Sequence, residues 1–288
     1  MYKVVTKRFL NDARTICLFE IEAPLVARHA QAGQFVIFRL DEQGERVPVS
    51  VAGYDREKGT VSVMVQAAGR TTKMLHTVEQ GDTILDFVGP LGKATEMEGL
   101  KKVCVVGGGV GCAIAYPIAK EMHAKGIDVT FIAGFRSADI VILKEELKAA
   151  SDTLIICTDD GSYGEKGFTT VFLKNEIEAN IKENKPQFDR VIAIGPDIMM
   201  KFLADVTRPY EISTVISLDP IMVDGTGMCG GCRVIVGGET KFACVDGPDF
   251  DAHQVDFDSL IKRAAFYQDE QNEAAKHFCR ITGGKRNA

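Results

Sequence analysis

The first 98 residues consist of short apolar runs that alternate with turn residues. The segment from Val61 to Gln66 shows the apolar–polar alternation of a half-buried strand. Several short strands separated by turns predict a small antiparallel barrel, with one inserted helix at residues 71–78. The predicted strands occupy residues 3–8, 15–21, 34–40, 47–52, 60–66 and 83–87.

From residue 99 to residue 216 the sequence pattern is different: runs of β-branched residues alternate with helical stretches. Such alternation predicts a parallel sheet that is covered by helices on both faces. The predicted strands are 102–106, 128–133, 153–157, 190–194 and 212–216, and the helices are a stretch ending at Ala124, then 138–150, 169–184 and 197–206.

The remaining residues, 217–288, hold a cysteine-rich segment and a predicted helix at 257–276. The predicted fold class is therefore a β-barrel plus an α/β domain with a small C-terminal subdomain. We expect domain limits of 1–98, 99–216 and 217–288.

Composition and charge narrow the classes of function. The chain has 288 residues, of which 34 are basic and 40 acidic, and its net charge is −6. The sequence has no long basic stripe, so nucleic acid is not an expected partner. Residues 1–14 carry charges every few positions and lack the apolar core of a signal peptide. The longest uncharged run is short and rich in glycine, so we expect a cytoplasmic protein without a membrane span.

A glycine-rich turn, Gly107 to Gly111, follows the first predicted strand of the α/β domain and opens a helix. Such a turn lets the backbone approach a pyrophosphate at the helix N-terminus. Turns at Asp160 and Gly195 follow two other strands and are expected at the same sheet edge. The alternative is that all three are only structural turns. The expected dinucleotide-binding residues are Gly108, Gly109, Gly111, Asp160 and Gly195.

The predicted barrel carries a second set of candidate residues, whose types suit a diphosphate. Arg46 precedes a strand that continues through Pro48, Val49 and Ser50, although a lone arginine is more often a solvated surface charge. The inserted helix begins at a turn whose backbone N–H groups and hydroxyls suit phosphate oxygens. That turn contains Gly69, Thr71 and Thr72.

The cysteine segment gives the sharpest signal. Asp224, Cys229, Cys232 and Cys244 reproduce the plant-type [2Fe–2S] spacing, with aspartate at the first ligand position. Zinc is the main rival, but zinc sites usually present paired knuckles or histidines, and the nearby sequence has neither. The blander interpretations are free cysteines in a loop and an Asp224 that merely caps the glycine turn.

These motifs together resemble the ferredoxin–NADP reductase superfamily over nearly the whole chain. The matching residues are 33–35, 46–50 and 107–111. The iron–sulfur segment and residues 159–168 are similar to one branch of that superfamily. This branch contains the electron-transfer subunit of dihydroorotate dehydrogenase B and the small (alpha) subunit of NADH-dependent reduced ferredoxin:NADP⁺ oxidoreductase, also known as a sulfide dehydrogenase subunit.

The resemblance implies a barrel that binds FAD, an α/β domain that binds NAD(H) and a C-terminal [2Fe–2S] cluster. It assigns the barrel candidates to the flavin, although Arg46 lies four residues before Ser50 instead of the usual three. Flavin lies between nicotinamide and cluster because it alone exchanges both hydride and single electrons. The cofactors then carry the chemistry, so we predict no catalytic acid or base.

The aspartate at position 224 favours the oxidoreductase sibling, because the dihydroorotate sibling has four cysteines. The resemblance then implies a larger flavoprotein partner with [4Fe–4S] clusters and the NADP(H) site, exchange with ferredoxin and electron bifurcation. The helix after Cys244 is expected to dock that partner. The alternatives are a dihydroorotate dehydrogenase subunit, a stand-alone NAD(P)H flavin reductase and a non-enzymatic nucleotide sensor. Arg136 leaves the choice between NAD and NADP open.

Overall fold

A computed structural model describes residues 1–266, 269–270 and 273. The N-terminal part forms one seven-stranded sheet in the order β6-β1-β2-β5-β4-β3-β7, in which every pair is antiparallel. Its strands are β1 Tyr2–Phe9, β2 Ile16–Glu22, β3 Phe35–Arg39, β4 Val47–Asp55, β5 Thr60–Gln66, β6 Thr83–Ile84 and β7 Asp86–Leu91.

This sheet closes almost completely on itself, which confirms the predicted barrel. The outer strands β6 and β7 are separated only by Leu85, whose N–H group donates to the carbonyls of Arg39 and Leu40 at 3.0 and 3.1 Å. The side chains of Phe19, Phe38 and Phe87 fill the barrel interior. Helix α1 (Pro24–His29) was not predicted, and the inserted helix is α2 (Arg70–Leu75). The single strand predicted at 83–87 is divided between β6 and β7.

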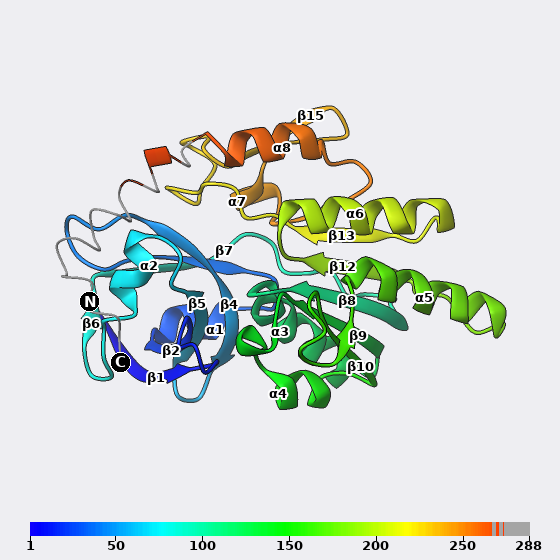
Figure 1. Ribbon diagram of the computed structural model, residues 1–288. Coiled ribbons are helices and arrows are strands. Elements are labelled where there is room, and N and C mark those ends of the chain that lie inside the picture. The colour runs from blue at the N-terminus through cyan, green and yellow to red at the C-terminus, as the bar shows by residue number, and fades with distance from the viewer. Residues whose placement is uncertain (267–268, 271–272, 274–288) are drawn as a thin grey trace.

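The second sheet has the order β11-β10-β9-β8-β12-β13-β16 and is parallel except for β16, which confirms the predicted α/β sheet. Its helices lie on both faces (Figure 1). The strands are β8 Lys102–Gly108, β9 Asp128–Phe135, β10 Thr153–Thr158, β11 Glu165–Lys166, β12 Arg190–Ile194, β13 Thr214–Ser217 and β16 Asp249–Asp251; the helices are α3 Gly111–Ala124, α4 Lys144–Ala149, α5 Thr169–Lys182 and α6 Asp197–Thr207, with 3₁₀ turns η1 Ala138–Ile140 and η2 Arg208–Tyr210.

The period of two in β8 explains the two covered faces. Val103 and Val105 belong to the core cluster that contains the buried side chains of α3 and α4. Cys104 and Val106 belong to the cluster that contains those of α5 and α6. The helix predicted at 138–150 is interrupted, because Leu143 takes a left-handed conformation with φ +57°.

The C-terminal part begins with the cysteine-bearing loop and lies across both preceding parts (Figure 1). It contains an unpredicted hairpin of β14 (Arg233–Val236) and β15 (Glu239–Phe242), followed by α7 (Ala243–Asp246) and α8 (Phe257–Ala264). Because β16 also pairs with β13, this part supplies the edge strand of the second sheet. The domain limits 1–98, 99–216 and 217–288 stay a prediction.

The helix predicted at 257–276 begins as α8, and its positions 267–268, 271–272 and 274–276 lie outside the described residues. Within the part of the chain that the structure describes, no helix combines the length and apolar character needed to cross a membrane.

Candidate nucleotide cleft and cysteine loop

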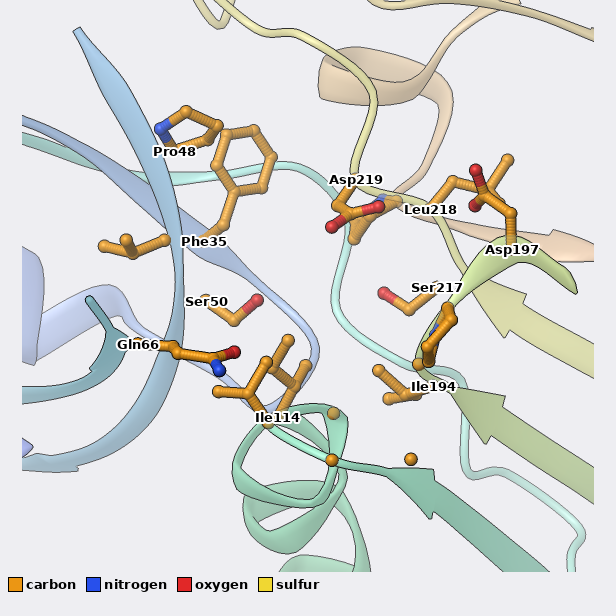
Figure 2. Close-up of a pocket in the computed structure, with 18 of the residues that line it drawn as sticks. Phe35, Pro48, Ser50, Gln66, Ile114, Ile194, Asp197, Ser217, Leu218 and Asp219 are labelled. Carbon is orange, nitrogen blue, oxygen red and sulfur yellow. The ribbon is translucent and has the colours of Figure 1, made fainter. Parts of the chain in front are cut away.

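A cavity of about 410 Å³ lies between the barrel and the second sheet. On the barrel side it is lined by Pro48, Val49 and Ser50 of β4, and on the sheet side by the turns that follow β8 and β12. Figure 2 shows Ser50 and Gln66 facing Ser217 and Asp219 across this space. The strand order reverses between β8 and β12, which is the point where open α/β sheets bind ligands.

A second cavity of about 870 Å³ continues from the first around the glycine turn. Both are lined by Gln66, Gly108, Gly109 and Pro196, so they form one bent cleft. The far end is lined by polar groups and by large apolar side chains that are about half exposed or more. These residues are Arg136, Ser137, Asp159, Phe168, Ile198 and Phe202.

The glycines of the turn have different roles. A Cβ atom on Gly111 would lie 2.3 Å from the carbonyl oxygen of Ile194, and one on Gly108 would lie 2.5 Å from the Met199 sulfur. These two glycines therefore permit close packing of β8, α3 and the turn after β12. Gly109 has φ +56° and open space where a side chain would begin. It leaves the backbone accessible to a ligand in the cleft.

Two predicted residues lie elsewhere. Asp160 lines neither cavity, and its carboxylate accepts hydrogen bonds from the backbone N–H and the hydroxyl of Ser162 at 2.9 and 2.6 Å. Its neighbour Asp159 lines the second cavity instead. Arg46 donates from Nε to the carbonyl oxygen of Val223 at 2.6 Å, so it ties the barrel to the cysteine-bearing loop.

The helix α2 forms one wall of a separate surface cavity with the loop from Leu40 to Glu45. The hydroxyl of Thr71 donates to the Glu45 carboxylate. The hydroxyl of Thr72 accepts from the N–H of Gly69 at 3.0 Å, and thereby fixes the turn before the helix. The three predicted residues of this turn thus lie together, although two of their groups already have partners within the chain.

Two carboxyl groups line the first cavity, of about 410 Å³, which we call the inner cavity. They were not singled out from the sequence. Burial, and secondarily the nearby Asp219, raises the pKa of Asp197 to about 6. Burial also raises the pKa of Asp219. Both residues line the cavity, and Figure 2 shows them on its sheet side. The position of Asp197 directly after the Gly195-Pro196 turn was the one available sequence signal.

The cysteine loop gathers part of the predicted ligand set. The sulfur atoms of Cys232 and Cys244 lie 3.2 Å apart and are buried, whereas Cys229 is exposed. Within residues 1–266, 269–270 and 273, no group of three or more His, Cys, Asp and Glu side chains is assembled as a metal site. Burial, and then the Cys232 sulfur, raises the pKa of Cys244 to about 12. This thiol therefore needs a cation before it ionises, as metal ligation would supply.

Asp224 holds the loop that follows it. One carboxylate oxygen accepts from the N–H of Thr226 at 2.9 Å, and the other accepts from the N–H of Cys229 at 2.7 Å. The bond from Thr226, followed by that from Cys229, lowers the pKa of Asp224. The carboxylate therefore lies beside the first cysteine, as a ligand must, and also performs the turn-capping role. Its assignment as an iron ligand stays a prediction.

Comparisons with known proteins bear on the whole chain. A sequence model of the iron–sulfur cluster binding domain of dihydroorotate dehydrogenase B matches residues 219–256. A Thermotoga maritima protein described as a homologue of the dihydroorotate dehydrogenase B (NAD(+)) electron transfer subunit is 46% identical over 265 residues, 92% of each chain. An uncharacterised Clostridium beijerinckii protein is 48% identical over 281 residues, which cover 95% of this chain and 93% of that one.

The chain belongs to the family of dihydroorotate dehydrogenase B electron-transfer subunits and their homologues. A solved structure of NADH-dependent reduced ferredoxin-NADP oxidoreductase, studied for flavin-based electron bifurcation, is similar with a TM-score of 0.88 and 41% identity; it covers 96% of this chain and 98% of that one. These findings confirm the predicted resemblance, the fold class and the class of oxidoreductase subunit. Members of the family are subunits of larger enzymes.

Proposed function

We propose that the chain is the flavin and iron–sulfur electron-transfer subunit of an NADH-dependent ferredoxin:NADP⁺ oxidoreductase complex. One observation carries this proposal: all three parts of the chain meet at one cavity. Ser50 comes from the barrel, Gly108 from the second sheet, and Met222 from the segment that leads into the cysteine loop. Family and fold support the three cofactors FAD, NAD(H) and a [2Fe–2S] cluster.

The residues present fit a flavin ring in the inner cavity. Pro48, Val49 and Ser50 offer an apolar strand surface with one hydroxyl, and the cavity opens toward the glycine turn. When bound there, the flavin would exchange a hydride with nicotinamide and single electrons with the cluster. The chain itself binds and orients the groups. Arg46, Gly69, Thr71 and Thr72 remain the proposed contacts for the rest of FAD.

The bent cleft also supports one direction for the proposed dinucleotide. The nicotinamide must meet the flavin, so it belongs at the Ser50 end, beside Gly195 and Gly111. The pyrophosphate then lies at Gly108 and Gly109, which line both cavities. The adenosine extends into the larger cavity. Asp160 remains a proposed part of the dinucleotide site, because its turn also contains Asp159, which lines the larger cavity.

The cysteine segment supplies the donor set of a [2Fe–2S] cluster, with three sulfurs and the Asp224 carboxylate. Their spacing and the buried Cys232–Cys244 pair fit a cluster held by one loop. Ligation needs reduced thiols, so a cytoplasmic location belongs to the same proposal. The larger partner, with its own flavin, [4Fe–4S] clusters and NADP(H) site, is proposed to dock near α8, and ferredoxin is the proposed acceptor or donor.

A second candidate is the electron-transfer subunit of an NAD-dependent dihydroorotate dehydrogenase, which the match at residues 219–256 favours. Anaerobic purification of the native complex separates the two. We expect a co-purifying flavoprotein with [4Fe–4S] signals, and reduction of NADP⁺ that requires both NADH and reduced ferredoxin. NADH formation from dihydroorotate and NAD⁺, without that activity, would instead assign the second candidate.

Failure of the isolated chain to reduce a dye with NADH would contradict both enzymes and favour a nucleotide sensor. Activity of the chain without any partner would indicate a stand-alone reductase. Comparing NADPH with NADH in the same assay tests whether Arg136, which lines the adenosine end, accommodates a 2′-phosphate.

A further inference from the structure

Two arginines hold the pair of glycines between Cys229 and Cys232. Arg233 donates from Nη1 to the carbonyl oxygen of Gly230 at 2.7 Å. Arg263 of α8 donates from Nη2 to the carbonyl oxygen of Gly231 at 3.1 Å. Two consecutive carbonyl oxygens of the loop thus each accept a hydrogen bond from a guanidinium group. Arg233 directly follows Cys232, whereas Arg263 lies 32 residues after Gly231, so only the fold brings Arg263 to the loop.

The Arg233 contact continues to a cysteine sulfur through a single peptide group. The N–H group of Gly231 belongs to the same peptide as the Gly230 carbonyl, and it donates to the Cys229 sulfur with N···S 3.4 Å. A peptide is planar, and its C=O and N–H groups point in opposite directions. A cation that fixes the oxygen therefore also fixes the direction of the N–H, and it polarises that bond toward the sulfur.

The second arginine is held in place from the other side. Helix α8 buries Phe257 and Leu260, and its first turn is capped by Asp256, which accepts from the N–H of Ser259 at 3.0 Å. Asp258 pairs with Lys201 of α6 at 2.8 Å. The position of Arg263 is thus set by packed structure outside the cysteine loop, so the loop is braced from its own hairpin and from α8.

We propose that Arg233 is a positioning residue that directs the Gly231 N–H onto the Cys229 sulfur and thereby raises the reduction potential of the cluster. Arg263, bound to the carbonyl of the next peptide, adds a second positive charge beside the loop. Reduction adds negative charge, and hydrogen bonds to the ligand sulfurs stabilise that charge. The two guanidinium charges act in the same direction. This inference rests on the proposed function, since it requires a [2Fe–2S] cluster at Cys229.

The test is a redox titration of the cluster, followed by EPR, in the complete cofactor-loaded complex. Arg233→Gln is expected to lower the midpoint potential, with a tenfold shift of the one-electron equilibrium appearing as 59 mV. Arg233→Lys keeps a charged donor and should recover most of the difference. Arg263→Gln should give a smaller shift of the same sign. Arg208→Gln is the matched control, because Arg208 is an exposed arginine that donates to the His253 carbonyl, away from the loop.

The outcomes separate this inference from the proposed function. Absence of a [2Fe–2S] signal from the unaltered complex overturns the proposed function. A normal signal, with equal midpoints for Arg233→Gln, Arg263→Gln and the control, overturns the inference alone. If Arg233→Gln lowers the iron content, recovery by Arg233→Lys supports the positioning role, and equal iron loss in Arg233→Lys together with an unshifted Arg263→Gln overturns it.

Discussion

The nucleotide cleft and the cysteine loop are built in different ways. The cleft is formed at the ends of β8 and β12 and against β4, so its lining residues come from distant parts of the chain. The predicted iron ligands all lie between Asp224 and Cys244. The cleft is shaped by packed cores on both of its sides, whereas the loop is held by a few hydrogen bonds to backbone groups.

This difference shows which site depends on the fold and which on local chemistry. The cleft is shaped by side chains that the fold buries, and its glycines are needed where another atom would collide. In the loop only Cys232 and Cys244 are drawn together by burial. The free energy of metal binding would bring the remaining predicted ligands together, because ligation and local folding are coupled. The two sites should therefore respond independently to substitution.

The largest effect is expected at the loop. Cys244→Ala removes a buried sulfur that we propose as a cluster ligand, so the chain should lose its cluster while NADH still reduces the flavin. Iron analysis and EPR measure the first effect, and anaerobic flavin bleaching measures the second. Cys157→Ala, which removes a buried cysteine outside the loop, is the control. Loss of flavin reduction in Cys244→Ala alone would show that the two sites depend on each other.

The same loop tests the unusual ligand. Asp224→Ala should lose iron or hold it weakly, whereas Asp224→Cys should keep a [2Fe–2S] centre with altered EPR spectrum and potential, because sulfur is a softer donor than oxygen. Full iron content and an unchanged spectrum in Asp224→Ala would mean that the carboxylate only caps the turn that contains Thr226 and Cys229.

The next largest effect is expected for a substitution in the glycine turn. Gly109→Val places a side chain in the open cleft, and NADH affinity should fall tenfold or more, which corresponds to about 1.4 kcal/mol. The cluster spectrum should stay unchanged. Gly126→Val is the matched control, since Gly126 also has positive φ and open space but lies beyond the end of α3, outside the cleft. Equal NADH affinities in both variants would place the pyrophosphate elsewhere.

A smaller effect tests the direction of the dinucleotide. Phe202 is 52% exposed and lines the larger cavity, where we expect the adenine. Phe202→Ala should raise the KM for NADH about fivefold, since an aromatic contact contributes about 1 kcal/mol. It should leave the KM for reduced nicotinamide mononucleotide, which lacks adenosine, unchanged. Val171→Ala, on an exposed apolar residue of α5, is the control. An equal rise for both substrates would contradict this direction.

The smallest effect is a pH dependence. The pKa of Asp197 is raised to about 6, so its carboxyl group becomes charged as pH rises through that value. The charge then lies in the cavity where we propose that NADH binds. Its reduced nicotinamide is neutral and its phosphates are anionic, so NADH affinity should fall a few-fold. Asp197→Asn should flatten this profile, as measured by titration calorimetry between about pH 5 and pH 8. Parallel profiles for the two proteins would exclude Asp197 as the source.

Much of the fold was predictable because its signals are local. The alternation in Val61–Gln66 and the strand–turn–helix pattern around Gly107–Gly111 gave the barrel and the α/β part. One error occurs where long-range contacts override the local pattern, and another where a local turn signal was missed. Helical propensity runs through 138–150, yet Leu143 turns left-handed and its side chain is buried against the sheet. The β14–β15 hairpin turns at Gly237 and Gly238, both with positive φ, a signal that the sequence did carry.

The same distinction between local sequence signals and long-range contacts applies to the candidate sites. The sequence by itself determined the cysteine spacing, the glycine turn and the order of barrel and α/β parts, because each is written in neighbouring residues. Only the tertiary structure decided that Ser50, Gly108 and Met222 share one cavity, that Asp159 rather than Asp160 lines the cleft, and that Arg263 reaches the Gly231 carbonyl. The physical reason is that strand order and helix packing bring together residues whose separation along the chain carries no record of that contact.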